Sequence, residues 1–263
     1  MKIALTIAGS DSGGGAGIQA DLKTFHQFGV FGTSAVVALT AQNTRGVSAV
    51  EPASPAMVAA QLDALADDLP PAALKTGMLA EAEIVAVVAG AIQANGWTQV
   101  VVDPVMVSTT GHRLLSLEAE TVLRAELLPL AALVTPNLDE VAILTGRQVT
   151  DPAAMERAGH DLLGLGARAA LVKGGHLLGD RLVDVLVTPA GVRRFEHPRL
   201  DTRSTHGTGC TLSAAITAGL ALGRDLETAV ADGLDFVHRA LAAAPGLGSG
   251  HGPLNHSVAA PPS

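Results

Sequence analysis

Short apolar segments alternate with longer amphipathic segments along this chain. The apolar segments have the length of β-strands and lie at Ile3–Ala8, Ser34–Thr40, Ala73–Thr76, Val100–Asp103, Leu130–Thr135 and Ala169–Lys173. Hydrophobic positions recur with helical spacing over Ala56–Asp68, Glu81–Ala94, Leu117–Leu127 and Pro152–Leu165. This alternation predicts βαβ units and an α/β fold with three layers, in which helices flank a mainly parallel central sheet.

Two further apolar segments are arranged differently. Arg181–Val187 and Val192–Glu196 are joined by only four residues, Thr-Pro-Ala-Gly. A connection this short predicts a β-hairpin, which adds a small antiparallel edge to the sheet. We find no internal repeat and no linker, so we expect residues 1–263 to form a single domain with a Gly/Pro-rich tail, 245–263, whose last residues are mobile.

The amino-acid composition argues against several kinds of binding partner, location and cysteine chemistry. Hydrophobic residues make up 48% of the chain, enough for a large core, while the formal net charge of −8 and the absence of a Lys/Arg run argue against nucleic-acid binding. The apolar start is too short for a signal peptide, and no apolar run is long enough to cross a membrane, so we expect a cytoplasmic protein. The lone Cys210 excludes an intramolecular disulfide and a Cys-rich zinc site.

A first glycine-rich turn, 9–17, follows a predicted strand and opens a helix. In this geometry backbone N–H groups point at an anion or a polar ligand. Gly15, Gly17 and Ala20 match the dinucleotide-binding pattern G-x-G-x-x-A, but no acidic residue occurs between Asp21 and Glu51, and no Gly-Lys pair of a Walker loop is present. A ligand-binding turn and a turn without a ligand both remain open from this segment alone.

A second glycine-rich turn, 204–211, precedes a helix of small and apolar residues. The first N–H groups of that helix lack intrahelical acceptors, and the helix dipole adds positive charge, so an oxyanion would be stabilised there. A thiol at this position should have a lowered pKa, which predicts that Cys210 accepts a proton from an alcohol. The alternative is a buried cysteine without a chemical role.

Polar residues with possible metal and phosphate chemistry follow three of the strands. Asp103 ends a strand, and Asn137 and Glu140 lie three residues apart on a first helical turn. Carboxylates there can hold Mg²⁺, although Asn137 and Glu140 also fit a helix capping box. Lys173 ends another strand beside two glycines, where it suits a polyphosphate; an ordinary surface lysine is equally compatible with the pattern.

Taken together, these segments resemble the hydroxymethylpyrimidine/phosphomethylpyrimidine kinases of the ribokinase-like superfamily over almost the whole chain. The resemblance is carried by Gly9–Asp21, Ala41–Thr44, Lys75–Met78, Val102–Met106, Thr135–Glu140, Lys173–His176, Thr205–Thr211 and His251–His256. It implies a ribokinase-like fold, phosphorylation of hydroxymethylpyrimidine and then of its monophosphate, ATP and Mg²⁺ as cofactors, and a homodimer. A pyridoxal kinase of the same superfamily and a non-catalytic pyrimidine-binding module are the alternatives.

The resemblance also implies roles for particular residues. Gln42 would pair with the aminopyrimidine edge, Asp21 would hold ring substituents, and Gly9, Met78 and Val105 would border the ring. The anion hole would comprise Gly207, Thr208, Gly209 and Cys210, with Cys210 in the place where many sugar kinases have Asp. ATP would be contacted by Lys173, Thr208 and Asn137. The Mg²⁺ ion would be bound by Glu140 and Asp103. In one departure, many relatives carry a Lys after Val107, whereas this chain reads Ser108-Thr109-Thr110-Gly111, followed by His112.

Overall fold

The computed structural model describes residues 1–106, 115–175 and 180–262. Its strands form a nine-stranded sheet in the order β3-β2-β1-β4-β5-β6-β7-β8-β9. Their bounds are β1 (Ile3–Asp11), β2 (Phe31–Asn43), β3 (Gly46–Pro52), β4 (Ala73–Thr76), β5 (Val100–Val102), β6 (Leu133–Val134), β7 (Ala170–Val172), β8 (Arg181–Thr188) and β9 (Gly191–Pro198). Pairing from β2 through β7 is parallel, while β3 at one edge and β8 and β9 at the other are antiparallel. The predicted mixed sheet and its hairpin are confirmed.

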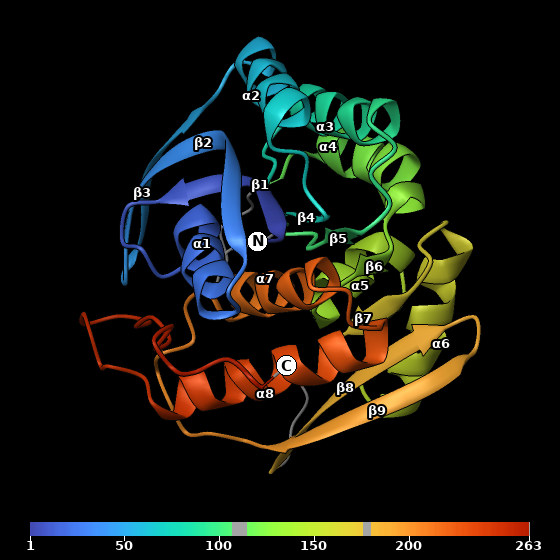
Figure 1. Ribbon diagram of the computed structural model, residues 1–263. Coiled ribbons are helices and arrows are strands. Elements are labelled where there is room, and N and C mark those ends of the chain that lie inside the picture. The colour runs from blue at the N-terminus through green and yellow to red at the C-terminus, as the bar shows by residue number, and fades with distance from the viewer. Residues whose placement is uncertain (107–114, 176–179, 263) are drawn as a thin grey trace.

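Helices cover both faces of this sheet (Figure 1). They are α1 (Gly17–Gln27), α2 (Pro55–Asp68), α3 (Ala82–Ala94), α4 (Leu117–Val122), α5 (Leu138–Thr145), α6 (Pro152–Gly164), α7 (Thr208–Ala221) and α8 (Leu226–Ala242). Helices α2 to α6 pack into one hydrophobic cluster, and α1, α7 and α8 pack into another. The three layers expected from the strand and helix alternation are therefore present.

The two hydrophobic clusters divide the residues of the parallel strands between them. Leu5 and Ile7 of β1 belong to the cluster under α2 to α6, whereas Ala4 belongs to the cluster under α1, α7 and α8. In β5, Val100 and Val102 face the first cluster and Val101 the second. Since successive side chains of a strand point to opposite faces, uninterrupted apolar runs are what a sheet buried on both sides requires.

The order of the strands reverses at β1. The chain runs from β1 to its neighbour β2 on one side, and then returns to β4 on the other side. Connections that leave a strand in opposite directions open a crevice at the carboxyl ends of the strands, where wound sheets bind their ligands. Gly9 of β1 and Gly77 after β4 lie at this crevice.

Some boundaries differ from the prediction. Strand β6 contains only Leu133–Val134, because Leu128–Leu130 forms a 3₁₀ turn, so the predicted start at Leu130 is wrong. The segment Leu117–Leu127 changes from α-helix to π-helix at Leu123. Strand β3 was not predicted. The segment Ser108–Gly111, His112 and His176 lie outside the described residues.

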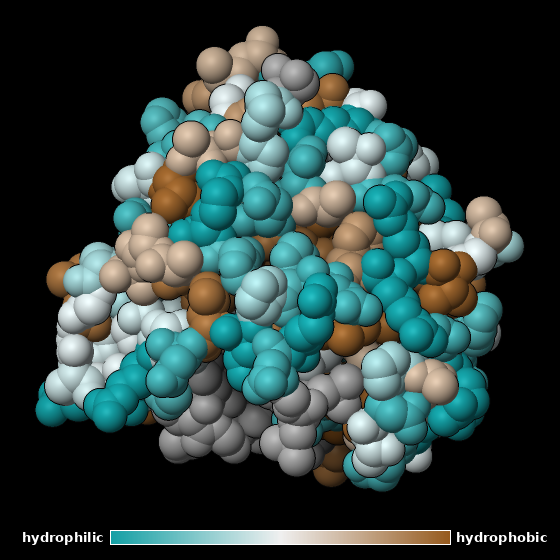
Figure 2. Space-filling view, turned by 90° about the horizontal axis from the view of Figure 1, so that it is seen from below, coloured by the Kyte–Doolittle hydropathy of each residue, from teal (hydrophilic) through white to brown (hydrophobic). Residues whose placement is uncertain are grey.

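Figure 2 shows a face on which hydrophilic residues predominate and smaller hydrophobic areas lie between them. Scattered exposed apolar residues of this kind are normal on folded proteins. Within residues 1–106, 115–175 and 180–262, no helix combines the length and the hydropathy that a bilayer span requires.

Candidate active site

A cavity of about 700 Å³ opens at the crevice beside β1, between the two glycine-rich turns. Volumes of this order are typical of small-molecule sites. Of the residues singled out from the sequence, the cavity is lined by Gly9, Gln42, Met78, Val105, Asp103, Asn137, Glu140, Lys173, Gly207, Thr208, Gly209 and Cys210. The structure thus brings together residues from segments that are far apart in the sequence.

Asp11 organises the first glycine-rich turn. Its Oδ1 accepts a hydrogen bond from the Gly13 N–H (2.7 Å), and its Oδ2 accepts from the N–H groups of Gly15 (3.0 Å) and Ala16 (2.8 Å). Its Oδ2 also lies 2.8 Å from His206 Nε2. Burial alone would raise the pKa of Asp11, but the hydrogen bond from His206 and those from the backbone outweigh it and lower the pKa. The side chain is therefore an ionised carboxylate that only accepts hydrogen bonds.

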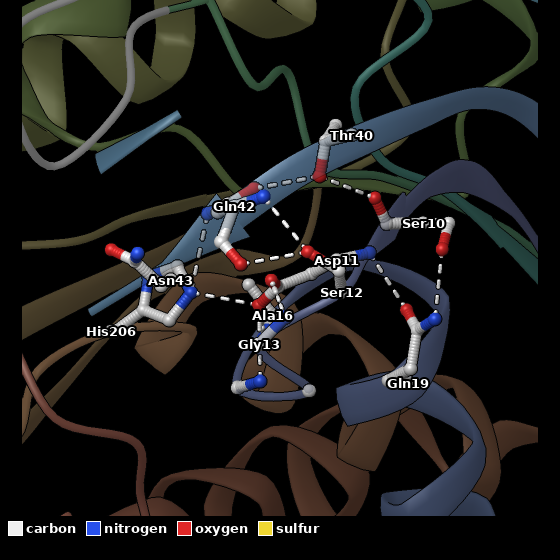
Figure 3. Close-up of polar contacts among 12 residues, drawn as sticks. Ser10, Asp11, Ser12, Gly13, Ala16, Gln19, Thr40, Gln42, Asn43 and His206 are labelled. Carbon is white, nitrogen blue, oxygen red and sulfur yellow. Dashed lines mark hydrogen bonds and ion pairs between the residues drawn. The ribbon is translucent and has the colours of Figure 1, made fainter. Parts of the chain in front are cut away.

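The Gln42 side chain extends from β2 toward the same group of residues (Figure 3). Its terminal amide lies between Thr40 and His206: Oε1 is 3.2 Å from Thr40 Oγ1, and Nε2 is 3.3 Å from His206 Nε2. Thr40 Oγ1 in turn donates to the Ser10 carbonyl at 2.7 Å. The amide that the resemblance assigns to ring binding thus lies between two other polar side chains.

The two glycine-rich turns touch each other. Gly207 has a left-handed conformation with φ of 83°, and a Cβ atom on it would lie 1.8 Å from the Gly15 carbonyl oxygen. Only glycine allows this approach and this conformation. The N–H of Gly17, at the start of α1, lies close enough to the sulfur of Cys210, near the start of α7, to favour its thiolate form. The amino ends of two helices therefore meet at Cys210.

The start of α7 has the open N–H groups that the sequence predicts. Gly207 precedes the helix and offers no side-chain cap, while the Thr208 N–H is used by the Thr205 carbonyl. In the described part of the chain, the N–H groups of Gly209 and Cys210 have no protein acceptor. Helix starts in this state bind anions.

The prediction of a lowered pKa for Cys210 is wrong. Its side chain is partly exposed, but it lies deep in the cavity, and burial raises the pKa of the thiol to about 11. Lys75 and the Gly17 N–H act in the opposite direction but do not outweigh burial and the nearby carboxylates Asp21 and Asp103.

Asp103 and Lys173 form an ion pair at the wall of the cavity, with Lys173 Nζ 3.2 Å from Asp103 Oδ1. Thr135 Oγ1 donates to the same carboxylate oxygen, and Ser213 Oγ of α7 lies 3.2 Å from Asp103 Oδ2. Burial alone would lower the pKa of Lys173, but the charges of Asp103 and Glu140 raise it. Lys173 is therefore a fixed positive charge, not an ordinary surface lysine.

Asn137 and Glu140 form the capping box at the start of α5. The Asn137 Oδ1 accepts from the Glu140 N–H (2.9 Å), and Glu140 Oε2 accepts from the Asn137 N–H (2.8 Å). Glu140 is 3% exposed, and burial raises its pKa to about 7. This structural role accounts for the spacing of the two residues, but both also line the cavity, so a further role toward a metal ion or ATP stays a prediction.

Asp21 does not line the cavity, which corrects the role expected for it. The side chain is fully buried between α1 and the sheet, where it accepts from Thr6 Oγ1 (2.6 Å) and pairs with Lys75 Nζ (2.9 Å). All of its described hydrogen bonds thus go to the protein interior. Direct contact between Asp21 and substituents of a ring in the cavity is not supported.

Three residues of this region carry no separate prediction from the sequence. Asp11 and His206 were seen only as parts of glycine-rich turns, although an acidic residue between glycines is a known sign of a side chain that binds backbone N–H groups. Lys75 lies in a predicted buried strand, and a lysine at such a place requires an anionic partner. That signal was available in the sequence.

Carboxylate oxygens suit Mg²⁺, and Asp103 and Glu140 supply them at the cavity. Among the described residues, no group of three His, Cys, Asp or Glu side chains is arranged to hold a metal ion. Mg²⁺ commonly takes its remaining ligands from substrate phosphates and water, so the residues present fit this ion as part of a nucleotide complex. A Cβ on Gly209 would lie 3.3 Å from Lys173 Nζ and 3.6 Å from Asp103 Oδ2, so glycine keeps this part of the cavity free of a side chain.

The chain is similar to known kinases over nearly its full length. It is 51% identical to the hydroxymethylpyrimidine/phosphomethylpyrimidine kinase of Rhizobium meliloti over 257 residues, 97% of this chain and 96% of the relative. The crystal structure of phosphomethylpyrimidine kinase from Clostridium difficile has a TM-score of 0.83 at 42% identity, covering 91% of this chain and 99% of that one.

A structure of an ADP complex of Bacillus subtilis pyridoxal kinase has a TM-score of 0.91 at 38% identity and covers 98% of both chains. The family model described as phosphomethylpyrimidine kinase matches residues 11–255, a range that includes Gln42, Lys173, Cys210 and the whole second glycine-rich turn. The chain therefore belongs to the phosphomethylpyrimidine kinase family.

Proposed function

We propose that this protein transfers the γ-phosphoryl group of ATP to 4-amino-5-hydroxymethyl-2-methylpyrimidine, and then phosphorylates the monophosphate, for thiamin biosynthesis. The observation that carries this proposal is that the open start of α7 shares one cavity with the amide of Gln42 and the ammonium group of Lys173. A phosphoryl acceptor and a phosphoryl donor can therefore bind on either side of Cys210. The names of the relatives support the same reaction.

The ring of the acceptor would bind between Gly9, Met78, Val105 and the amide of Gln42. A Cβ on Gly9 would lie 2.6 Å from Met78 Cε, so the Met side chain covers this glycine closely and forms an apolar surface. An amide can donate and accept at once, as a ring nitrogen next to an amino group requires. A flat heteroaromatic ring fits this combination.

The phosphate groups of ATP would bind at the start of α7 and at Lys173. The N–H groups of Gly209 and Cys210 would stabilise charge on the migrating phosphoryl group, since preorganised donors are the main catalytic device of phosphoryl transfer. Asp103 and Glu140 would hold Mg²⁺, which, when bound, neutralises phosphate charge. Asn137 and Thr208 would complete the nucleotide site.

Cys210 would accept the proton of the hydroxymethyl group. With its pKa raised to about 11, only about one thiol in 10⁴ is ionised at pH 7 in the free protein. Lys75 is the strongest charge that favours the thiolate, because it lies buried near the sulfur. The second phosphorylation needs no base, because its phosphate nucleophile is already ionised near neutral pH.

A pyridoxal kinase activity is the second candidate, because structures of pyridoxal kinases match this chain with TM-scores of 0.90 and above. The deciding experiment measures kcat/KM for hydroxymethylpyrimidine and for pyridoxal with the same enzyme, by coupled detection of ADP. We expect the pyrimidine to be preferred. A preference for pyridoxal would replace the proposal, and absence of ADP release with either alcohol would favour a non-catalytic pyrimidine-binding module.

We also propose that the protein acts as a homodimer in the cytoplasm, where ATP is available. Exposed apolar side chains on the β2 and β3 side of the molecule, including Phe31, Leu39 and Val50, support a contact between copies. Light scattering after gel filtration tests the dimer, and a monomeric mass at micromolar concentration would contradict it.

A further inference from the structure

The amide of Gln42 is surrounded by groups whose hydrogens can be counted. The Asp11 carboxylate already accepts from the backbone N–H groups of Gly13, Gly15 and Ala16, so it accepts from His206 as well and donates to nothing. Figure 3 shows the contact between His206 and Asp11 as a dashed line, and His206 Nε2 must carry the hydrogen of this bond. A nitrogen in this state cannot accept a hydrogen bond from Gln42.

The contact of the Gln42 amide with Thr40 also conflicts with Oε1 on the Thr40 side and Nε2 on the His206 side. Thr40 Oγ1 has a single hydrogen, and it is used at 2.7 Å on the Ser10 carbonyl. Only lone pairs of Thr40 Oγ1 remain for the Gln42 amide, 3.2 Å away. With Nε2 toward His206 and Oε1 toward Thr40, two donors would face each other on one side and two acceptors on the other.

A half-turn of the amide removes both conflicts without changing the shape of the side chain. The oxygen then accepts from the His206 Nε2–H, which it shares with Asp11, and the amino group donates to Thr40 Oγ1. Which end of an amide faces a partner is properly decided by such a hydrogen-bond network. One donor hydrogen and one lone pair of the amide remain for a ligand.

We propose that Asp11 and His206 fix the orientation of the Gln42 amide, and that this orientation decides which way round the aminopyrimidine ring enters the cavity. The inference rests on the proposed function. The amide oxygen, on the His206 side, pairs with the 4-amino group, and the amide nitrogen, on the Thr40 side, pairs with the adjacent ring nitrogen. His206 is thus a positioning residue that acts through Gln42.

The orientation has a direct consequence for the reaction. The hydroxymethyl group is attached to the ring carbon next to the one that carries the amino group. Placing the amino group on the His206 side therefore places the hydroxymethyl group on that side too, toward Gly207–Cys210, which directly follow His206 in the chain. The reversed amide would bind the ring with its alcohol directed away from the start of α7.

The test compares the 4-amino substrate with its 4-oxo analogue, in which a carbonyl replaces the amino group and the neighbouring ring nitrogen carries a hydrogen. A fixed amide oxygen repels this carbonyl, and sites built around buried hydrogen bonds reject mismatched partners strongly. We expect the wild-type kcat/KM to favour the amino compound by at least about 10²-fold. In His206→Leu the amide can turn, and the preference should fall at least about tenfold.

His206→Gln is the matched variant, because its side-chain N–H can still reach Asp11 and the Gln42 oxygen, and it should keep most of the wild-type preference. Lys23→Met, which alters a contact to Gly14 in the same turn but none to Gln42, should leave the ratio unchanged. A merely structural role of His206 lowers kcat/KM for both compounds equally, so an unchanged ratio in His206→Leu would overturn the inference. Failure of the wild-type enzyme to phosphorylate the amino compound would instead contradict the proposed function.

Discussion

Lys75 Nζ lies 2.9 Å from Asp21 Oδ1 at a place where neither side chain is exposed to solvent. Burial alone would lower the pKa of Lys75, but the charge of Asp21 raises it, so the lysine stays charged inside the protein. The pair joins β4 to α1 beneath α7, next to Cys210. It therefore links the stability of the fold to the electrostatics of the candidate active site.

Replacing one partner of this pair should be costly. Lys75→Met leaves a buried carboxylate without its counter-ion, which typically costs about 3–5 kcal/mol of unfolding free energy. The double variant Lys75→Met/Asp21→Leu leaves no unpaired charge and should recover much of that loss. Urea unfolding of the wild type, Lys75→Met, Asp21→Leu and the double variant measures these values, and a double variant that loses as much stability as the sum of the two single variants would contradict the prediction.

The raised pKa of Cys210 predicts slow alkylation in the free protein. Because Cys210 is the only cysteine, its reaction with iodoacetamide can be followed by mass spectrometry without ambiguity. The rate at pH 7–8 should be far below that of the urea-unfolded chain, and it should keep rising with pH toward about 11. A plateau reached below pH 8 would mean that the thiol has a lowered pKa after all.

Cys210→Ala should separate the two phosphorylation steps. Loss of general-base help typically lowers a rate by about 10²–10⁴, and we expect a loss in that range for the alcohol. The step that uses a phosphate nucleophile should lose much less. Single-turnover measurements with hydroxymethylpyrimidine and with its monophosphate give the two values, and equal losses would assign Cys210 to structure or anion binding instead.

Glu140 should make the protein less stable as the pH rises through the range between 4.5 and about 7. Its pKa is about 7 in the folded protein and 4.5 ordinarily, so the folded state holds the proton more tightly across this window. Unfolding free energy contributed by Glu140 is therefore fully present below about pH 4.5 and is lost as the pH approaches 7.

Glu140→Gln keeps an oxygen that can accept from the Asn137 N–H, but it does not titrate. The variant should gain stability relative to wild type as the pH rises from 5 to 7.5, by on the order of a few kcal/mol. Urea unfolding at several pH values measures this difference. The comparison with wild type cancels other groups that titrate nearby, such as Asp184, and a constant difference across the window would contradict the prediction.

Gly209→Ala should weaken nucleotide binding without unfolding the protein. The new Cβ would occupy space between α7, Lys173 and Asp103. We expect the KM for ATP to rise at least about tenfold, since a methyl group there competes with a phosphate oxygen. Gly90→Ala is the control, because nothing lies within 4 Å of its Cβ on α3; it should stabilise the protein by about 0.5–1 kcal/mol and leave KM unchanged.

The parallel core of the fold could be predicted because its strands are short apolar runs between clear breaks. Ala73–Thr76 was predicted with the observed bounds, since Pro70-Pro71 and Gly77 enclose it. Leu128–Leu130 misled the prediction because leucine suits a helical turn as well as a strand. Strand β3 is largely exposed and lacks a continuous apolar run, so periodicity alone does not reveal it.

The candidate active site could be predicted in part, because local sequence signals mark most of the segments that line its cavity. Strand ends and glycine-rich turns marked most of the cavity, but pairings across long sequence distances were not visible. The contact between Asp11 and His206 joins residues 195 positions apart. The resemblance to the kinase family assigned Asp21 to the ring, yet α1 directs its side chain toward Lys75. The thiol pKa was misjudged because burial depends on the surrounding elements and not on the local motif.

The contact between Gly15 and Gly207 also affects how the protein is made. Gly15 and Gly207 are about 190 positions apart in the sequence, so the first turn leaves the ribosome well before the second, and the two cannot meet until both have been made. Translation adds about 5–20 residues per second. The surface of β1 that α7 later covers is therefore made on the order of ten seconds or more before α7. During that interval the nascent chain presents an uncovered hydrophobic face to holding chaperones.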